Sequence, residues 1–183
     1  MLLYYKLFRG DTVELFNSRR MTNIGVMTAV YVVMTLLCMP LAYGDVQFRI
    51  SEMLVLFCFF NKDYILSMAF GCFLANLLSP MGMIDVAIGT GATLIAVLLI
   101  YFSRKEVNLF VASLFPVISN GLIVGAELKY FQGLDFWKSA ALVALGEFVC
   151  VSIIGVLLVG SLSKNRGFMK LITAGIDTTD EKR

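Results

Sequence analysis

Four carboxylates and two amides stand within or at the ends of apolar stretches of this sequence, where polar side chains are costly. They are Glu52, Asp85, Glu127, Glu147, Asn76 and Asn120. A carboxylate accepts two hydrogen bonds side by side, which suits a guanine-type N–H edge, and it also neutralises an ammonium group. Amides supply donors and acceptors for a ring carbonyl and for ring nitrogens. The pattern therefore indicates recognition of a small polar solute without a reaction.

An aromatic and polar segment precedes Glu52. It reads Tyr43-Gly44-Asp45-Val46-Gln47-Phe48-Arg49. Aromatic rings stack on flat heterocycles, so Phe48 is a candidate solute-binding residue, as are Tyr43, Tyr130 and Trp137. Each of these rings can instead anchor the chain at a membrane surface, which is the interpretation we favour for Trp137. Arg49 and Glu52 are three residues apart, so a structural ion pair explains them as well as a ligand contact does.

The depth of each carboxylate in a bilayer separates two interpretations. A charge near a helix end can simply lie in the headgroup zone, and this alternative stays open for Asp45, Glu127 and Asp135. Glu147 differs because alanine, leucine, glycine and phenylalanine surround it and about four turns of apolar helix follow. We expect it to lie below the interface and to face other helices.

The composition predicts the elements that position these groups. Hydrophobic residues make up 59% of the chain and charged residues 15%, with a mean hydropathy of +0.85. A bilayer core of about 30 Å needs roughly 20 apolar residues per crossing helix. We predict an all-α membrane protein of six transmembrane helices, at residues 22–41, 51–61, 64–78, 84–103, 108–128 and 136–162. The second and third are short, so they either tilt little in a thinned region or are sheltered by protein.

The basic residues predict the orientation. With the N-terminus inside, twelve of the fifteen lysines and arginines fall in cytoplasmic segments, leaving Arg49, Lys129 and Lys138 outside. This asymmetry favours an N-in, C-in topology. Residues 1–21 are then a cytoplasmic segment, 22–162 the six-helix solute-binding domain and 163–183 a cytoplasmic tail. We expect no signal peptide in the first residues. In this topology the acids and amides all lie in the outer half of the membrane.

Several classes of function are disfavoured. The net charge of +2 is small and the basic residues form no patch, which argues against nucleic-acid binding. The four cysteines show no C-x-x-C pair and the chain has no histidine, so we expect no metal and no cofactor.

Two local features of the helices have open interpretations. Gly25 and Ala29 are small residues four apart that lie on one helix face with Thr22, and such faces permit close packing, either with a partner protein or within the chain. Pro116 precedes Ser119 and Asn120, where a kink either turns the helix toward a ligand or is simply tolerated.

At these residues the chain resembles the QueT-like family of queuosine-precursor transporters, which are substrate-binding S components of energy-coupling factor (ECF) transporters. The resemblance covers roughly residues 22–162. It rests on Val46-Gln47-Phe48-Arg49-Ile50-Ser51-Glu52, Gly71-Cys-Phe-Leu-Ala75-Asn76-Leu-Leu-Ser, Asp85-Val-Ala-Ile-Gly89, Asn120-Gly121 and Gly125-Ala126-Glu127-Leu128.

The resemblance implies a six-helix subunit of the bacterial cell membrane that captures a 7-deazaguanine from outside: the aminomethyl or nitrile precursor of queuosine, or queuine. It implies docking on a transmembrane coupling protein and two cytoplasmic ATPases, with no catalytic site of its own. The family commonly docks through Ala-x-x-x-Ala on the first helix; here Gly25 replaces the first alanine and Ala29 matches the second. The implied solute-binding residues are Gln47, Arg49, Glu52, Asn76, Asp85, Asn120, Glu127 and Glu147.

Three other functions are compatible with parts of this sequence. An intramembrane hydrolase is disfavoured because the chain has no histidine and only Asp85 is a candidate intramembrane aspartate. An ion-coupled secondary transporter stays open, since outer-layer acids bind protons and cations, although no inverted repeat is evident. An S component for another vitamin-like solute also stays open, because fold alone does not fix a ligand.

Overall fold

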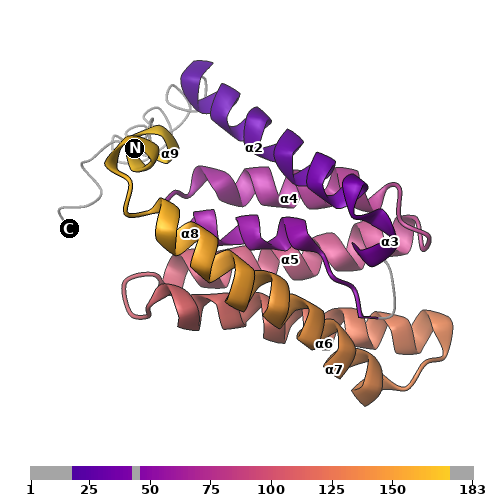
Figure 1. Ribbon diagram of the computed structural model, residues 1–183. Coiled ribbons are helices and arrows are strands. Elements are labelled where there is room, and N and C mark those ends of the chain that lie inside the picture. The colour runs from indigo at the N-terminus through magenta and orange to yellow at the C-terminus, as the bar shows by residue number, and fades with distance from the viewer. Residues whose placement is uncertain (1–17, 43–45, 174–183) are drawn as a thin grey trace, which may run out of the picture.

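The computed structural model describes residues 18–42 and 46–173, and within these ranges every regular element is helical (Figure 1). The elements in chain order are α2 (Ser18–Leu37), α3 (Met39–Ala42), η1 (Ile50–Phe59), α4 (Asp63–Asn76), α5 (Met83–Ser103), α6 (Leu109–Gln132), α7 (Phe136–Glu147), η2 (Phe148–Gly155), α8 (Val156–Leu162) and α9 (Arg166–Ile172). The all-α prediction is confirmed for the described residues. The first predicted span begins earlier than expected, at Ser18.

Among the described residues, four helices are long and apolar enough to cross a membrane, which is the pattern of a multi-pass membrane protein. They are Arg20–Leu37, Met83–Ser103, Leu109–Gln132 and Phe136–Leu162, the last formed by α7, η2 and α8 in continuous succession. The segments predicted as the second and third spans form the helices η1 and α4, with ten and 14 residues, and neither is among these four helices. Both are shorter than a bilayer crossing ordinarily requires.

The η1 helix has unusual geometry and an unusual location. It is a 3₁₀ helix, whose rise of about 2.0 Å per residue extends ten residues to roughly 20 Å, compared with about 15 Å for an α-helix. All residues from Ser51 to Cys58 are buried. In Figure 1, η1 lies inside the bundle, and it contacts α2, α4, α5 and η2. This burial agrees with the expectation that protein shelters the short elements.

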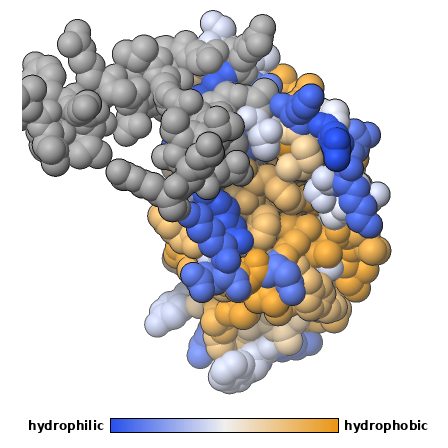
Figure 2. All heavy atoms as spheres, turned by 90° about the vertical axis from the view of Figure 1, so that its left-hand side faces the viewer, coloured by the Kyte–Doolittle hydropathy of each residue, from blue (hydrophilic) through white to orange (hydrophobic). Residues whose placement is uncertain are grey.

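Polar contacts join several segments at one end of the bundle. Arg20 in the first turns of α2 forms an ion pair with Asp63 at the start of α4. The Asn61 side chain donates a 2.8 Å hydrogen bond to the carbonyl of Ile172 in α9 and accepts one from the Asp63 amide. Figure 2 looks onto this end, where hydrophilic side chains border an apolar surface. The described chain thus enters and leaves the bundle at the same end.

Candidate solute-binding site

Arg49 and Asn76 connect three elements at the opposite end of the bundle. The Arg49 guanidinium donates a 2.7 Å hydrogen bond from Nη2 to Asn76 Oδ1, and Asn76 Nδ2 donates a 3.0 Å bond to the Asp85 carbonyl. Gly89 on α5 faces this pair: a Cβ there would lie 2.9 Å from Asn76 Nδ2. A larger residue at this position would push against the end of the Asn76 side chain and move its amide away from α5.

Glu52 lies in the centre of the bundle and is fully buried. Its Oε1 accepts hydrogen bonds from the Tyr31 hydroxyl of α2 and, at 3.3 Å, from the Thr93 hydroxyl of α5. Its Oε2 has no hydrogen-bond partner among the described residues. Because buried acceptors are normally satisfied, Oε2 is available to a donor that the protein chain does not supply.

Asn120 and Glu147 form a second buried pair, between α6 and α7. Asn120 Nδ2 donates a 2.8 Å hydrogen bond to Glu147 Oε1. Asn120 Oδ1 and Glu147 Oε2 are buried, and neither finds a partner in the part of the chain that is described. Glu147 is an electrostatic neighbour of both Glu52 and Arg49. The Arg49–Asn76 pair and the Asn120–Glu147 pair therefore belong to one polar cluster, and Glu147 faces other helices.

Asp85 and Glu127 bring α5 and α6 together. The Ser79 hydroxyl donates to Asp85 Oδ2. Glu127 is only 2% exposed, and no donor among the described residues reaches either of its carboxylate oxygens. Its carboxyl group neighbours that of Asp85. The carboxyl group of Glu127 is therefore buried between helices and does not face the surface of the protein.

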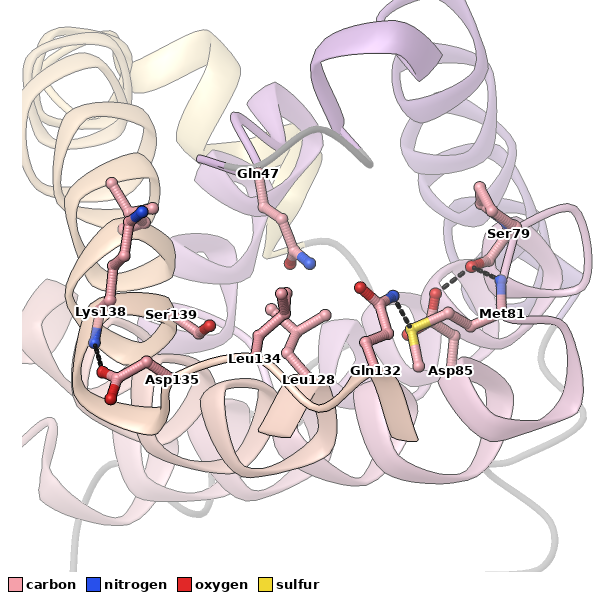
Figure 3. Close-up of a pocket in the computed structure, with 12 residues that line it drawn as sticks. Gln47, Ser79, Met81, Asp85, Leu128, Gln132, Leu134, Asp135, Lys138 and Ser139 are labelled. Carbon is pink, nitrogen blue, oxygen red and sulfur yellow. Dashed lines mark hydrogen bonds between the residues drawn. The ribbon is translucent and has the colours of Figure 1, made fainter. Parts of the chain in front are cut away.

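A cavity of about 330 Å³ opens beside this cluster (Figure 3). Gln47 and Asp85 line it, and Figure 3 shows Gln47 reaching in from the segment before η1. Its other lining residues are Ser79, Pro80, Met81, Leu128, Gln132, Leu134, Asp135, Lys138, Ser139 and Leu142. The size suits a compact heterocycle, and the mixed lining is typical of small-molecule sites.

The polar members of that lining were mostly absent from the predicted site. Ser79 follows α4, whereas Gln132, Asp135, Lys138 and Ser139 surround the turn between α6 and α7. Asp135 also caps α7 by accepting a 2.9 Å hydrogen bond from the Lys138 amide. Their position at turns that the predicted topology places outside was a usable signal, because the predicted pocket opens at those turns.

The aromatic candidates divide into three groups. Phe48 is half-buried and packs against the apolar core. Tyr130 and Trp137 are 85% and 74% exposed and do not line the cavity, which is the behaviour of membrane-interface anchors. Tyr43, like Asp45, lies outside the described residues.

The predicted docking residues lie on a different surface. Gly25 and Ala29 are both exposed on α2, and a Cβ added to Gly25 would meet no atom within 4 Å. Close packing within the chain, the alternative explanation for these small residues, is therefore not what the structure shows for Gly25.

Known proteins share this sequence pattern. The sequence model described as "QueT transporter" matches residues 21–164, which include every site residue named above. The chain belongs to the QueT transporter family. This QueT family member is also 34% identical over 156 residues to the "Queuosine precursor transporter QueT" of Lactococcus lactis subsp. cremoris (strain MG1363), a match that covers 78% of this chain and 90% of that protein. No solved structure matches it. The resemblance inferred from the motifs is confirmed.

Proposed function

We propose that this QueT family member is the solute-binding S component of an ECF transporter and captures a queuosine precursor from outside the cell. The observation that supports it best is the set of buried acceptors without a partner among the described residues. They are Glu52 Oε2, Asn120 Oδ1, Glu127 Oε1 and Oε2, and Glu147 Oε2. Such a set favours a solute rich in N–H donors, because each donor would satisfy an acceptor that is otherwise costly to bury.

A 7-deazaguanine has the matching chemistry. Its pyrimidine ring presents a ring N–H and an exocyclic amine on one edge, which suit the acceptors of Glu147 and Asn120. Its ring carbonyl would accept from the Arg49 guanidinium. The name of the Lactococcus relative, a queuosine precursor transporter, supports the same class of solute.

We further propose the membrane arrangement predicted above: six spans with both termini cytoplasmic, in a bacterial cell membrane. In this arrangement η1 and α4 act as the second and third spans, shielded by the longer helices. The end that holds Arg20, Lys62 and α9 is then cytoplasmic, and the cavity opens outward. The clustering of basic residues at the α9 end supports this orientation. Residues 22–162 form the binding domain, flanked by cytoplasmic segments 1–21 and 163–183.

The proposed partners are a transmembrane coupling protein and two cytoplasmic ATPases, which would supply the energy of ATP hydrolysis. The chain itself then needs no catalytic site. The exposed Gly25 and Ala29 face of α2 is the proposed contact with the coupling protein, since small residues let a partner helix approach closely.

Bulky residues on this face should separate solute capture from uptake. Gly25→Leu and Ala29→Leu are expected to lower uptake about tenfold or more in cells that contain the coupling module, because the side chain holds the partner helix away. Solute affinity of the purified variants should stay within about twofold of wild type. Gly91→Leu on α5, where an added Cβ also meets no atom within 4 Å, is the matched control. Normal uptake by both α2 variants would reject the docking face.

A binding panel tests the function itself. The purified protein in detergent is titrated by calorimetry with the aminomethyl and nitrile 7-deazaguanines and queuine, with guanine and folate as controls. We expect selective binding of at least one deazaguanine, with guanine and folate at least about tenfold weaker, a difference of 1.4 kcal/mol. Absence of binding across the deazaguanines would reject the proposed solute. Uptake that follows an ion gradient without the ATPases would favour the ion-coupled alternative.

A further inference from the structure

The charge of the cluster is strongly unbalanced. Glu52, Asp85, Glu127 and Glu147 are all buried there, whereas Arg49 is the one buried basic side chain in the described part of the chain. Arg49 is an electrostatic neighbour of Glu52, Glu127 and Glu147, so one guanidinium serves several carboxyl groups. Lys138 lines the cavity but is exposed, where solvent screens its charge. The site is therefore short of buried positive charge.

The deficit is greatest at Asp85 and Glu127. Glu52 accepts from Tyr31 and Thr93, and Glu147 accepts from Asn120. Glu127 receives no donor from the described residues although it is almost wholly buried, and its neighbour Asp85 receives only the Ser79 hydroxyl through its side chain. A buried carboxylate without donors is costly unless a cation or a proton compensates it.

The position of Asp85 and Glu127 relative to the cavity determines which group can compensate their buried negative charge. Asp85 lines the cavity, and the carboxyl group of Glu127 adjoins it from α6. Glu127 does not itself line the cavity, so a group that enters from the cavity meets Asp85 first and Glu127 behind it. An ammonium group carries three N–H donors and one positive charge, so it can donate to both acids at once. A nitrile carries neither, and in its place both oxygens of Glu127 would stay without a donor.

We propose that Asp85 and Glu127 form an ammonium subsite, which makes this chain selective for a solute that carries a primary or secondary amine over its neutral counterpart. This inference rests on the proposed function, since it selects among the precursors of that class. Asp85 contacts the amine from the cavity wall, and Glu127 accepts from it behind Asp85. The flat ring then lies toward Glu147, Asn120 and Arg49.

The test compares two dissociation constants for each protein, those of the aminomethyl and the nitrile 7-deazaguanine, measured by calorimetry on the detergent-purified full chain. In the wild type the aminomethyl form should bind about 10- to 100-fold more tightly, as one charge-assisted hydrogen-bonding group provides. Glu127→Gln should reduce that ratio to within about threefold, because the amide keeps the shape but loses the charge. Because both dissociation constants are measured on the same preparation, their ratio does not depend on how much of the protein is inactive.

Two further variants complete the experiment. Glu106→Gln alters an exposed carboxylate outside the site and should keep the wild-type ratio. Asp85→Asn is a second probe of the subsite and decides the matter if Glu127→Gln fails to fold. A wild-type protein that binds the nitrile form as tightly as the amine would overturn the subsite while leaving the proposed function standing. An unchanged ratio in the folded subsite variants would do the same. Binding of no deazaguanine by the wild type would reject the proposed function, and the subsite with it.

Discussion

Replacing Glu147 by glutamine is expected to weaken solute binding by about 100-fold, which corresponds to about 2.7 kcal/mol. Glutamine keeps a carbonyl oxygen that can accept the 2.8 Å hydrogen bond from Asn120, so the contact between α6 and α7 is preserved. The second carboxylate oxygen, which has no partner among the described residues, becomes an NH₂ group. The solute then loses a charge-assisted acceptor and meets a donor in its place.

The thermal stability of the Glu147→Gln variant distinguishes a loss of solute affinity from misfolding. Because the substitution removes a buried charge and keeps the volume, the melting temperature of the purified variant without solute should equal or exceed that of wild type. Calorimetry with the tightest-binding deazaguanine measures the affinity. Glu106→Gln, which makes the same chemical change at an exposed position, should bind as wild type does. Wild-type affinity in Glu147→Gln would remove Glu147 from the site.

Replacing Gly146 by alanine is expected to displace the backbone of the segment before η1, which carries Gln47 into the cavity. A Cβ at this position would lie 2.2 Å from the Val46 carbonyl oxygen and 2.8 Å from that of Gln47. Real Cβ atoms do not approach oxygen this closely, and neither oxygen is the end of a flexible side chain. The segment before η1 must therefore move away from α7, taking Gln47 and Arg49 with it.

The expected result for Gly146→Ala is a loss of solute affinity of about 100-fold or more, together with a destabilisation of about 1–3 kcal/mol, as overpacking in well-packed regions produces. Thermal unfolding with and without solute measures both effects. Gly91→Ala is the control, because an added Cβ there meets nothing within 4 Å and alanine favours the helix. Wild-type solute affinity in Gly146→Ala would mean that the close contact of this segment with α7 does not affect solute binding.

Most helix positions were predictable because they depend on local sequence. The apolar runs at 84–103, 108–128 and 136–162 correspond closely to α5, α6 and the helix from α7 to α8. The 3₁₀ geometry of η1 was not predictable, since its eight consecutive buried residues result from surrounding helices and not from a period in its own sequence. The early start of α2 is likewise tertiary, because Arg20 is held by Asp63 across 43 residues of chain.

The site was predictable in its residue types and less so in its geometry. The depth of Glu147 followed from its apolar neighbours, and its partner Asn120 was on the candidate list but was not paired with it. An ion pair of Arg49 with Glu52 was one explanation of their spacing; in the structure Arg49 is an electrostatic neighbour of Glu52 and also donates a hydrogen bond to Asn76, which the spacing did not indicate. Spacing indicates which residues share a helix face, but contacts between helices depend on how the helices are rotated against each other.

By itself the sequence determined that this is a helical membrane protein of the QueT family with a polar, acid-rich candidate site, because hydropathy, charge and motifs are properties of short segments. Only the tertiary structure decided which acids lie together and which acceptors are left without donors. It brought Glu127 beside Asp85 and placed Gln47, with its positive φ of 46°, at the cavity. Those arrangements depend on the packing of helices far apart in the chain, where a single Cβ at Gly146 would prevent the fit.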